Sequence, residues 1–366
     1  MKTALYGGSF DPVHNAHVEI ISNLSKLFDK VVVMPTAISP FKLQGGCANT
    51  EHRLNMLHLC DFSNNVQILD YEIKKGGISY TADTIRYLLQ CGYDNISVVI
   101  GSEELPNLYK WKEIDFINQF GFFIIPRPGF SIEQNCDYNI EIANFTGKEV
   151  SSAMIRVDVA FDNSLQTPKR VEEYILSNNL YDEWKIYTSE YLQFNMKPSR
   201  IKHTYGCIKA GIELAKRFNG NINCVITSLI LHDIGKYTNK EFLQKKGIYT
   251  QNFVENLPEH LRHAYYSEAI ASQYFNITDK TILNAIKNHT TCDIDMDVCS
   301  EITALADYIE EGRNFDGVEE VRALAKLSLK KAVAKMLEIT LNYLKSVNAD
   351  IGEQSIKAYE FYKNFL

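Results

Sequence analysis

The chain has 366 residues, of which 45% are hydrophobic and 23% are charged, and its formal net charge at pH 7 is −7. This length is sufficient for two domains that each have a core of their own. The acidic balance argues against a general nucleic-acid-binding protein, which usually carries a basic surplus. No apolar run approaches the roughly 20 residues that span a bilayer, so we expect no membrane segment and no membrane partner.

The eight cysteines are scattered along the chain and form no Cys-x-x-Cys pair. This distribution favours reduced thiols over a disulfide framework or a zinc site. Residue 5 already belongs to the first predicted strand, so we expect no secretory leader. Together these features predict a cytoplasmic protein, and they leave its oligomeric state open.

In the first half of the chain, short apolar runs alternate with helical patterns. Buried strands are predicted over residues 2–6, 30–35, 66–71, 96–101 and 122–125. Between them, apolar residues recur at helical spacing, for example after Val18, from Glu51 and over Ile85–Leu89. This alternation predicts an α/β Rossmann-like domain with a doubly wound parallel sheet, which we assign to residues 1–183.

The stretch 7–17 reads GGSFDPVHNAH and lies where the first strand ends and a helix begins. Such a junction binds phosphate in α/β sheets, because free backbone N–H groups and the positive end of the helix dipole meet there. His14 and His17 are three residues apart and share a helical face, from which both imidazoles can donate to phosphate oxygens. By spacing alone, the same histidines could equally be helix caps or surface residues.

A second polar string, VSSAMIR, occupies residues 150–156. Ser151 or Ser152 can cap a helix, and Arg156 lies one turn further along it. Hydroxyl, free amides and guanidinium together form a polyphosphate clamp. The alternative is a capped surface helix with a solvated arginine.

These strings resemble those of bacterial nicotinate-mononucleotide adenylyltransferases, which belong to the HxGH nucleotidyltransferases. Residues 7–17 resemble the signature GGTFDPxHxGH, with Ala16 in place of a glycine, and residues 150–156 resemble ISSTxIR, with Ala153 in place of its threonine. Further matches are EHRL at 51–54, SYTADT at 79–84, Trp111 and PRPG at 126–129, while Gly-Ser-Glu at 101–103 replaces the usual Gly-Ala-Asp. The resemblance extends from residue 1 to about residue 182.

The resemblance implies attack of a nicotinate mononucleotide phosphate on the α-phosphorus of ATP, with pyrophosphate as the leaving group and Mg²⁺ as cofactor. His14 and His17 are the implied catalytic residues. The implied ATP-binding residues are Gly7, Gly8, Ser9, Phe10, His14, His17, Gly101, Ser151, Ser152 and Arg156. The implied substrate-binding residues are Lys42, Thr81, Trp111 and Arg127. We expect Ala16 to reduce the room in the site without abolishing activity.

After about residue 182 the strand-like runs disappear and apolar residues follow a helical period to the end of the chain. The boundary falls between Tyr181 and Pro198, and we predict an all-α domain over residues 184–366. Its informative residues are histidines and acids, namely His203, His232, Asp233, His263, His289 and Asp307. A carboxylate such as Asp307 in an apolar helix is costly unless it is paired or metal-bound. The set therefore favours a metal with nitrogen and oxygen ligands.

This half resembles the HD phosphohydrolase superfamily, whose pattern is H…HD…D, and within it the YqeK-type proteins that hydrolyse diadenosine tetraphosphate symmetrically to two ADP. The matching strings are RIKHT at 200–204, LHDIGK at 231–236, HTT at 289–291 and ADYIE at 306–310, followed by Arg313. His263 corresponds to an additional histidine of that family, and His260 is the nearby alternative.

The resemblance implies a dinuclear site in which His203, His232, Asp233 and Asp307 bind one metal and His263 and His289 help to bind a second. Iron or manganese is expected, because a mixed nitrogen and oxygen set without a thiolate suits them better than zinc. Asp233 and Lys236 are the expected catalytic residues, and Lys236 and Arg313 are expected to hold outer phosphates.

We therefore predict a bifunctional enzyme of NAD biosynthesis whose ligands are ATP, nicotinate mononucleotide and diadenosine tetraphosphate, and which does not act on nucleic acid. One alternative is a transferase for nicotinamide mononucleotide or phosphopantetheine. Another is an HD domain that senses a nucleotide without turning it over.

Overall fold

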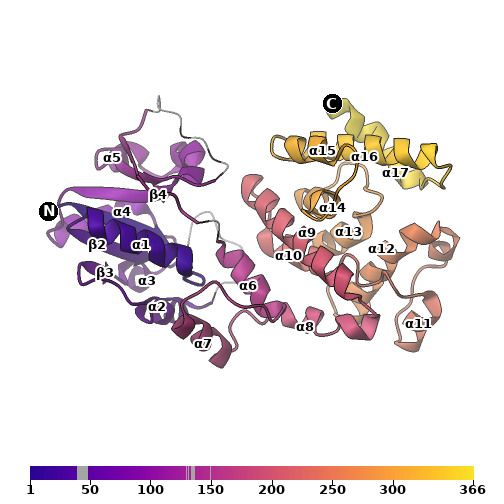
Figure 1. The fold of residues 1–366 in the computed structure, drawn as a ribbon, viewed down its shortest axis with the longest axis horizontal. Helices are drawn as coiled ribbons and strands as arrows, with labels where there is room; N and C mark the ends of the chain where they lie inside the picture. Colours follow the sequence, from indigo (N-terminus) through magenta and orange to yellow (C-terminus); the bar gives the residue numbers. More distant parts are fainter. Residues whose placement is uncertain (39–47, 129, 131, 133–136, 149) are drawn as a thin grey trace. The chain divides into compact units, whose positions relative to one another are not determined.

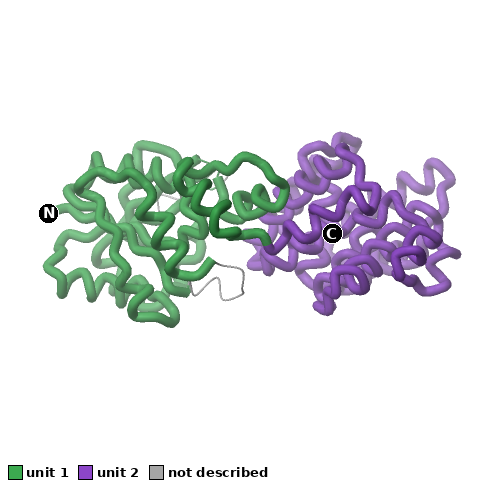
Figure 2. The backbone as a smooth tube through the Cα atoms, turned by 90° about the horizontal axis from the view of Figure 1, so that it is seen from below, with its two compact units in different colours: residues 1–182 green, residues 183–366 purple. Residues whose placement is uncertain are grey.

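The computed structural model describes residues 1–38, 48–128, 130, 132, 137–148 and 150–366. The chain divides into two compact units, Met1–Asp182 and Glu183–Leu366, which are coloured separately in Figure 2. Each unit is described by itself below.

The first unit is built on a parallel sheet of six strands, seen in Figure 1. The strands are β1 (Thr3–Gly8), β2 (Lys30–Pro35), β3 (Val66–Ile68), β4 (Ile96–Gly101), β5 (Phe122–Ile125) and β6 (Ile140–Ile142). Their order in the sheet is β3-β2-β1-β4-β5-β6, and all neighbours are parallel. The chain thus winds outward from β1 in one direction and from β4 in the other, so the topological switch point lies between β1 and β4.

Helices connect these strands and cover both faces of the sheet. They are α1 (Asn15–Leu27), α2 (Thr50–His58), α3 (Tyr71–Lys75), α4 (Thr81–Gln90), α5 (Ile114–Asn118), α6 (Ser152–Ala160) and α7 (Lys169–Ser177), with a 3₁₀ segment η1 (Ser102–Lys110). Alternate residues of β1 face opposite cores: Ala4 and Tyr6 pack with α1, α2, α6 and α7, whereas Leu5 packs with α4, η1 and α5. The predicted doubly wound α/β fold is confirmed.

One local prediction needs correction, and one strand was not predicted. The strand expected over 66–71 ends at Ile68, and Tyr71 instead begins α3, where its ring stacks on that of Tyr87 at 3.8 Å. Tyr87 belongs to α4, and a run of apolar residues in the sequence gives no sign of this contact between two helices. Strand β6 was not predicted, because it is only three residues long and has the charged Glu141 at its centre.

The second unit is helical throughout, as predicted. Its helices are α8 (Lys185–Thr188), α9 (Pro198–Arg217), α10 (Ile222–Leu231), α11 (Lys240–Lys245), α12 (Glu259–Ala269), α13 (Lys280–Asn288), α14 (Val298–Ile309), α15 (Val318–Ala325), α16 (Leu329–Ser346) and α17 (Glu353–Tyr362). Shorter turns are η2 (Tyr191–Phe194), η3 (Asn252–Asn256), the π-helical η4 (Ile270–Tyr274) and η5 (Lys363–Phe365).

Helix α10 is the centre of this unit. Residues 225–231 of α10 are all buried, and α9, α13 and α14 pack against it. Helix α9 starts at Pro198, whose fixed φ suits a first helical position, so His203 lies within the helix and not at its start. Across the described residues, no helix combines the length and the apolar character that crossing a membrane requires.

Candidate functional sites

The first site lies in the turn between β1 and α1, at the switch point of the sheet. His14 is the N-cap of α1, and its Nδ1 accepts a hydrogen bond from the backbone N–H of His17 at 3.3 Å. The Nδ1 of His17 accepts in return from the N–H of His14, also at 3.3 Å, and the two rings stack with centroids 3.5 Å apart. Because both Nδ1 atoms accept, the proton of each neutral ring is on Nε2. Capping and phosphate binding are therefore compatible: one edge of each ring caps the helix and the other is a donor.

Residues 151–156 lie against this turn. Ser151 occupies the N-cap position of α6, but its side chain makes no capping hydrogen bond. Ser152 instead donates from Oγ to the carbonyl of Pro12 at 3.0 Å. Arg156 pairs with Asp11: its Nη1 donates to Oδ2 at 3.0 Å and to the backbone carbonyl at 3.2 Å. The Nε of Arg156 is buried and has no hydrogen-bond partner, so the guanidinium has an N–H donor that Asp11 does not use.

Asp11 joins several segments at this point. Asp11 is 1% exposed, and its Oδ1 accepts from the hydroxyl of Tyr181 at 2.7 Å and from the N–H of Ala48 at 3.1 Å. Arg53 supports the same turn by donating to the carbonyl of Ser9 at 2.6 Å. Asp11 and Arg53 belong to the matched strings GGSFDPVHNAH and EHRL, which were the available signal for a role at this site. Tyr181 lies in no such string, and no role was predicted for it.

The remaining predicted residues of this unit follow other strands. Gly101 ends β4, Thr81 begins α4, and Trp111 follows η1 with a buried Nε1 that has no hydrogen-bond partner. Arg127 follows β5, and its backbone N–H donates to the Oγ of Ser102 at 2.9 Å. Because the strands are parallel, the ends of β1, β4 and β5 lie on one edge of the sheet. Lys42 lies outside the described residues.

Ala16, which replaces the glycine of the resembled signature, lies in the first turn of α1 between the two histidines. Its methyl group is fully shielded from solvent.

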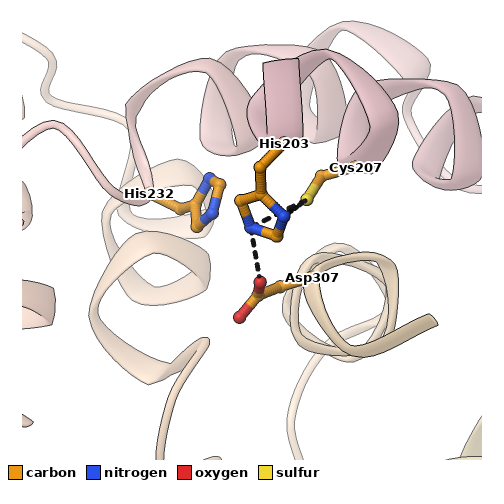
Figure 3. Close-up of side chains that lie close together, drawn as sticks. All are labelled: His203, Cys207, His232 and Asp307. Atoms are coloured by element: carbon orange, nitrogen blue, oxygen red, sulfur yellow. Dashed lines mark hydrogen bonds and ion pairs between the residues drawn. The ribbon is translucent and has the colours of Figure 1, made fainter. Parts of the chain in front are cut away.

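The second site draws side chains from five helices of the helical unit around Asp233. His203 comes from α9, His263 from α12 and Asp307 from α14, while His232 and His289 are the C-caps of α10 and α13. The structure brings together all six of the side chains predicted to bind metal. Figure 3 shows part of this cluster, with His203 between His232 and Asp307.

The two carboxylate oxygens of Asp233 face two different groups of side chains. Its Oδ2 lies 3.4 Å from Nε2 of His232 and 4.0 Å from Nε2 of His203, which itself lies 2.9 Å from Oδ1 of Asp307. Its Oδ1 lies 3.2 Å from Nε2 of His263 and 3.8 Å from Nε2 of His289. One carboxylate therefore bridges two clusters of nitrogen and oxygen donors.

The histidines of this cluster have the opposite tautomer to those of the first site. His232 donates from Nδ1 to the carbonyl of Leu229 at 2.6 Å, and His289 donates from Nδ1 to that of Ile286 at 2.7 Å. A carbonyl can only accept, so the lone pair of each neutral ring is on Nε2, the atom that binds metals.

His203 and Glu310 form an equivalent pair, with 3.0 Å between Nδ1 and Oε1. Glu310, quoted in the sequence only as part of a matched string, is thus the carboxylate that orients His203.

Two buried polar atoms of this cluster lack a hydrogen-bond partner, as expected of a metal site. Nε2 of His232 and Oδ1 of Asp233 are buried without a hydrogen-bond partner, although the two residues are only 0% and 2% exposed. Buried polar atoms without a partner are costly, and a cation would satisfy both. The backbone carbonyls of Leu229 and Ile286 orient the rings of His232 and His289 without any atom from outside the chain.

Electrostatics within the cluster follow from burial and from the close packing of opposite charges. Burial alone would raise the pKa of Asp233, but His232 and His263 hold that pKa well below its usual range. Burial, together with the neighbouring His232 and His263, lowers the pKa of His289 from 6.5 to about 3. Burial alone would lower the pKa of His232, but Asp233, Asp307 and the carbonyl of Leu229 together raise it. Asp233 is therefore ionised and His289 neutral, the states that metal ligation requires.

Three cations border the cluster. Arg200 donates to Oδ2 of Asp233 at 2.8 Å, and Arg313 donates to Oδ1 of Asp307 at 2.6 Å. Lys236 lies 3.1 Å from Nε2 of His263. These cations suit a polyanionic ligand beside the metal donors.

A cavity of about 440 Å³ lies beside the cluster and is lined by Lys236, Glu259, His260 and His263. Of the two histidines that the sequence left as alternatives, His263 contacts Asp233 and His260 lines the cavity.

Cys207 belongs to the same cluster and was not predicted. It lies on α9 four residues after His203, and its Sγ is 3.4 Å from Nε2 of His203. Burial and the surrounding carboxylates raise the pKa of this thiol well above its ordinary value. The signal in the sequence was the spacing of four residues, which puts two side chains on one helical face.

Comparison with known proteins agrees with this division. Residues 5–158 match the cytidylyltransferase-like family and residues 200–312 match the HD domain family.

Solved structures match about half of the chain each. A predicted HD superfamily hydrolase involved in NAD metabolism, from Clostridium acetobutylicum, is 27% identical, with 50% of this chain and 97% of that chain covered and a TM-score of 0.45. The nicotinic acid mononucleotide adenylyltransferase of Plasmodium falciparum, complexed with NaAD, is 21% identical over 50% of this chain and 98% of that chain, with a TM-score of 0.43. A putative nicotinate-nucleotide adenylyltransferase from Vibrio parahaemolyticus is 20% identical over 50% and 97%, with a TM-score of 0.37.

The turn that carries His14 and His17 lies within the first matched segment, and the cluster around Asp233 lies within the second. The chain therefore joins a cytidylyltransferase-like domain to an HD domain.

Proposed function

We propose that the first unit transfers the adenylyl group of ATP to nicotinate mononucleotide, giving nicotinate adenine dinucleotide and pyrophosphate. The observation that carries this proposal is the reciprocal capping of His14 and His17, which puts the N–H of each neutral ring on Nε2. Two such donors at a strand-to-helix turn suit an α-phosphate whose negative charge grows in the transition state.

Each of the neighbouring side chains has a role in this reaction. Ser152 and Arg156 would hold the pyrophosphate, and the unpaired Nε of Arg156 supports this role because Asp11 does not occupy all of its donors. Gly7, Gly8, Ser9, Phe10, Gly101 and Ser151 would complete the ATP site. Mg²⁺, when bound, would neutralise phosphate charge. No covalent nucleophile is required, and catalysis would consist of positioning and charge stabilisation.

The pyridine end would lie at the same sheet edge. Trp111 would stack on the ring, and its buried Nε1 without a partner supports a ligand at this position. Thr81 and the backbone near Trp111 would bind the nicotinate carboxylate, while Lys42 and Arg127 would complete the substrate site.

The test compares nicotinate mononucleotide with nicotinamide mononucleotide as substrates of the full chain, with ATP and Mg²⁺. We expect the nicotinate form to be preferred in kcat/KM. His17→Ala should lose the activity, whereas His58→Ala, which changes an exposed histidine of α2, should keep it. A preference for the nicotinamide form would replace the proposed substrate with its amide.

We further propose that the HD unit is a metal-dependent phosphohydrolase that cleaves diadenosine tetraphosphate with one water into two ADP. The observation that carries this proposal is Asp233, whose two oxygens face separate groups of histidine Nε2 atoms. His203, His232, Asp233 and Asp307 would hold one metal, and His263 and His289, with Asp233, would hold a second. Iron or manganese is proposed.

When bound, the two cations would polarise phosphoryl oxygens and stabilise charge on the entering and leaving oxygens. The protein supplies the rest of the chemistry. Asp233 fixes the separation of the two donor groups, and Lys236, which already reaches the cavity wall, would neutralise an outer phosphate. Arg313 would hold another phosphate while it orients Asp307.

Product analysis of wild type and His232→Ala tests both units together. Each protein receives ATP with nicotinate mononucleotide, and then diadenosine tetraphosphate, with Mg²⁺, Mn²⁺ or Fe²⁺. We expect the variant to keep dinucleotide synthesis and to lose ADP formation. Formation of ATP and AMP instead of ADP would contradict symmetrical cleavage. Bound metal without hydrolysis by wild type would favour an HD unit that only senses nucleotides.

We propose a cytosolic location for both activities. Thiols of Cys60, Cys91, Cys207, Cys224, Cys292 and Cys299 are all free in the structure, which supports a reducing compartment.

A further inference from the structure

One donor in the metal cluster of the HD unit is a sulfur atom. Nδ1 or Nε2 of His203 and His232, a carboxylate oxygen of Asp307 and Sγ of Cys207 all lie within 4.8 Å of one another. Figure 3 shows these four side chains converging from α9, the end of α10 and α14. Cys207 is completely buried, so its sulfur faces the cluster and not solvent.

The helix itself places this sulfur. His203 and Cys207 are four residues apart on α9, a helix of 20 residues, and therefore project from the same face. The Sγ lies 3.4 Å from Nε2 of His203, the nitrogen that also lies 2.9 Å from Asp307. A pair of ligands at this spacing on one helix can bind a single metal ion.

A second observation is that one nitrogen atom of the cluster has no hydrogen-bond partner. Nε2 of His232 is buried without any hydrogen bond, in a side chain that is 0% exposed. Its Nδ1 donates to the carbonyl of Leu229, so in the neutral ring Nε2 carries a lone pair that can bind a cation. The sulfur and this nitrogen belong to the same four-residue group.

We propose that Cys207 is a ligand of the metal ion held by His203, His232 and Asp307. This inference rests on the metal site proposed above. On binding, the thiol gives its proton to solvent and the sulfur lone pair forms the bond to the metal, with no change of oxidation state. A thiolate is softer than imidazole or carboxylate, so it shifts the preference of this position away from manganese and toward iron, zinc or cobalt.

Cobalt substitution of the full-length protein tests the inference spectroscopically. Visible d–d bands report that Co²⁺ is bound, whereas a near-ultraviolet charge-transfer band reports a bond between sulfur and cobalt. We expect wild type to have both, Cys207→Ser to keep the visible bands and lose the near-ultraviolet band, and Cys299→Ser to match wild type. Cys299 is a fair control, because it is also buried in this unit but its Sγ contacts Ser228 at 3.7 Å.

A band that is absent from wild type, or that persists in Cys207→Ser, overturns the inference. X-ray absorption of the zinc-loaded wild type removes any dependence on the variant: a sulfur scatterer at about 2.3 Å supports ligation, and a shell of nitrogen and oxygen alone rejects it.

These measurements also separate the inference from the proposed hydrolysis. ADP formation without a sulfur–metal bond rejects Cys207 and keeps the phosphohydrolase. A sulfur–metal bond without ADP formation keeps Cys207 and rejects the reaction.

Discussion

The two units use histidine in opposite ways, and the backbone decides which. In the transferase turn, Nδ1 of His14 and His17 accepts from backbone N–H groups, so each Nε2 carries a proton. In the HD unit, Nδ1 of His232 and His289 donates to backbone carbonyls, so each Nε2 carries a lone pair. The same side chain therefore presents a hydrogen-bond donor at the first site, as the proposed phosphate binding requires, and a lone pair at the second, as the proposed metal binding requires.

The difference follows from where each histidine lies on its helix. At a helix N-terminus the unpaired backbone groups are N–H donors, and at a C-terminus they are C=O acceptors. His14 and His17 belong to the first turn of α1, whereas His232 and His289 are the C-caps of α10 and α13. Position at a helix end thus selects the tautomer, and the tautomer selects the chemistry.

The largest expected effect comes from removing the carboxylate that both metal groups share. Asp233→Asn should lower ADP formation by at least about 10³-fold, the upper end of the cost of losing one electrostatic group, and should reduce the bound metal. Dinucleotide synthesis should remain at the wild-type rate. Metal analysis and product assays of the same sample measure both effects.

The control for this variant is Asp316→Asn, which changes an exposed aspartate of the same unit. Retention of metal and hydrolysis by Asp233→Asn would show that the two donor groups do not depend on their shared residue.

The donor role of the transferase histidines can be tested by changing which atom carries N–H. The amide nitrogen of glutamine reaches about as far as Nε2, whereas that of asparagine reaches only as far as Nδ1. We expect His17→Asn to lower kcat of adenylyl transfer by about 10²–10³-fold and His17→Gln to lose much less. Equal losses in steady-state assays of the two variants would contradict an Nε2–H donor.

The lone-pair role of His289 predicts a pH dependence of stability. Burial and the neighbouring His232 and His263 lower its pKa from 6.5 to about 3. As the pH falls below 6.5, the unfolded imidazole binds a proton before the folded one, so stability that is present above pH 6.5 is progressively lost. The pKa of His232 is raised, so the stability that its protonation contributes is fully present below pH 6.5 and does not change with pH there. Metal-free protein should lose about 3 kcal/mol between pH 6.5 and 4 from His289.

Denaturant unfolding of the metal-free protein measures this slope. Trp184 is buried in the HD unit, and Trp111→Phe removes the other tryptophan, so fluorescence then reports the HD unit alone. His289→Gln should flatten the slope. An unchanged slope in that variant would assign the pH dependence to other groups.

Glu310 should affect metal binding through His203. Its carboxylate accepts from Nδ1 of His203 at 3.0 Å, which fixes the ring and leaves Nε2 for the metal. Glu310→Ala is expected to weaken metal binding about 10–100-fold, the usual cost of losing such a partner. The matched control is Glu311→Ala, because Glu311 is an exposed neighbour that pairs with Lys209. Competition with a chromophoric chelator measures both, and equal affinities would reject an orienting role for Glu310.

The sequence could predict features that depend on residues close to one another in the chain. Apolar runs located β1, β2, β4 and β5, and the spacing of His14 and His17 placed them in one helical turn. The boundary was predicted after residue 183, and the compact units divide after Asp182. These features depend on neighbours in the chain, which a single sequence contains.

What it could not predict depends on contacts between distant residues. Asp11 accepts hydrogen bonds from Arg156 and Tyr181, which lie 145 and 170 residues further along the chain. No periodic pattern in the sequence links these residues. Glu310 is the C-cap of α14, and only the approach of α9 to α14 brings it to His203. The contact of Cys207 with the cluster likewise depends on Asp307 and His232 from other helices. The tautomers were likewise hidden, because they depend on which backbone group each ring meets.

The smallest expected effect concerns Ala16, which lies between the two transferase histidines. Its methyl group is fully shielded from solvent, so a ligand that replaces solvent in the site does not touch it. Ala16→Gly should therefore change KM for ATP less than about twofold, yet it should lower the stability of the first unit by roughly 1–2 kcal/mol through helix propensity and a lost buried methyl. Denaturant unfolding and ATP titration of the same preparation measure both quantities. A severalfold fall in KM would mean that the methyl group limits the nucleotide site, and the stacked histidine pair would then have to shift to admit ATP.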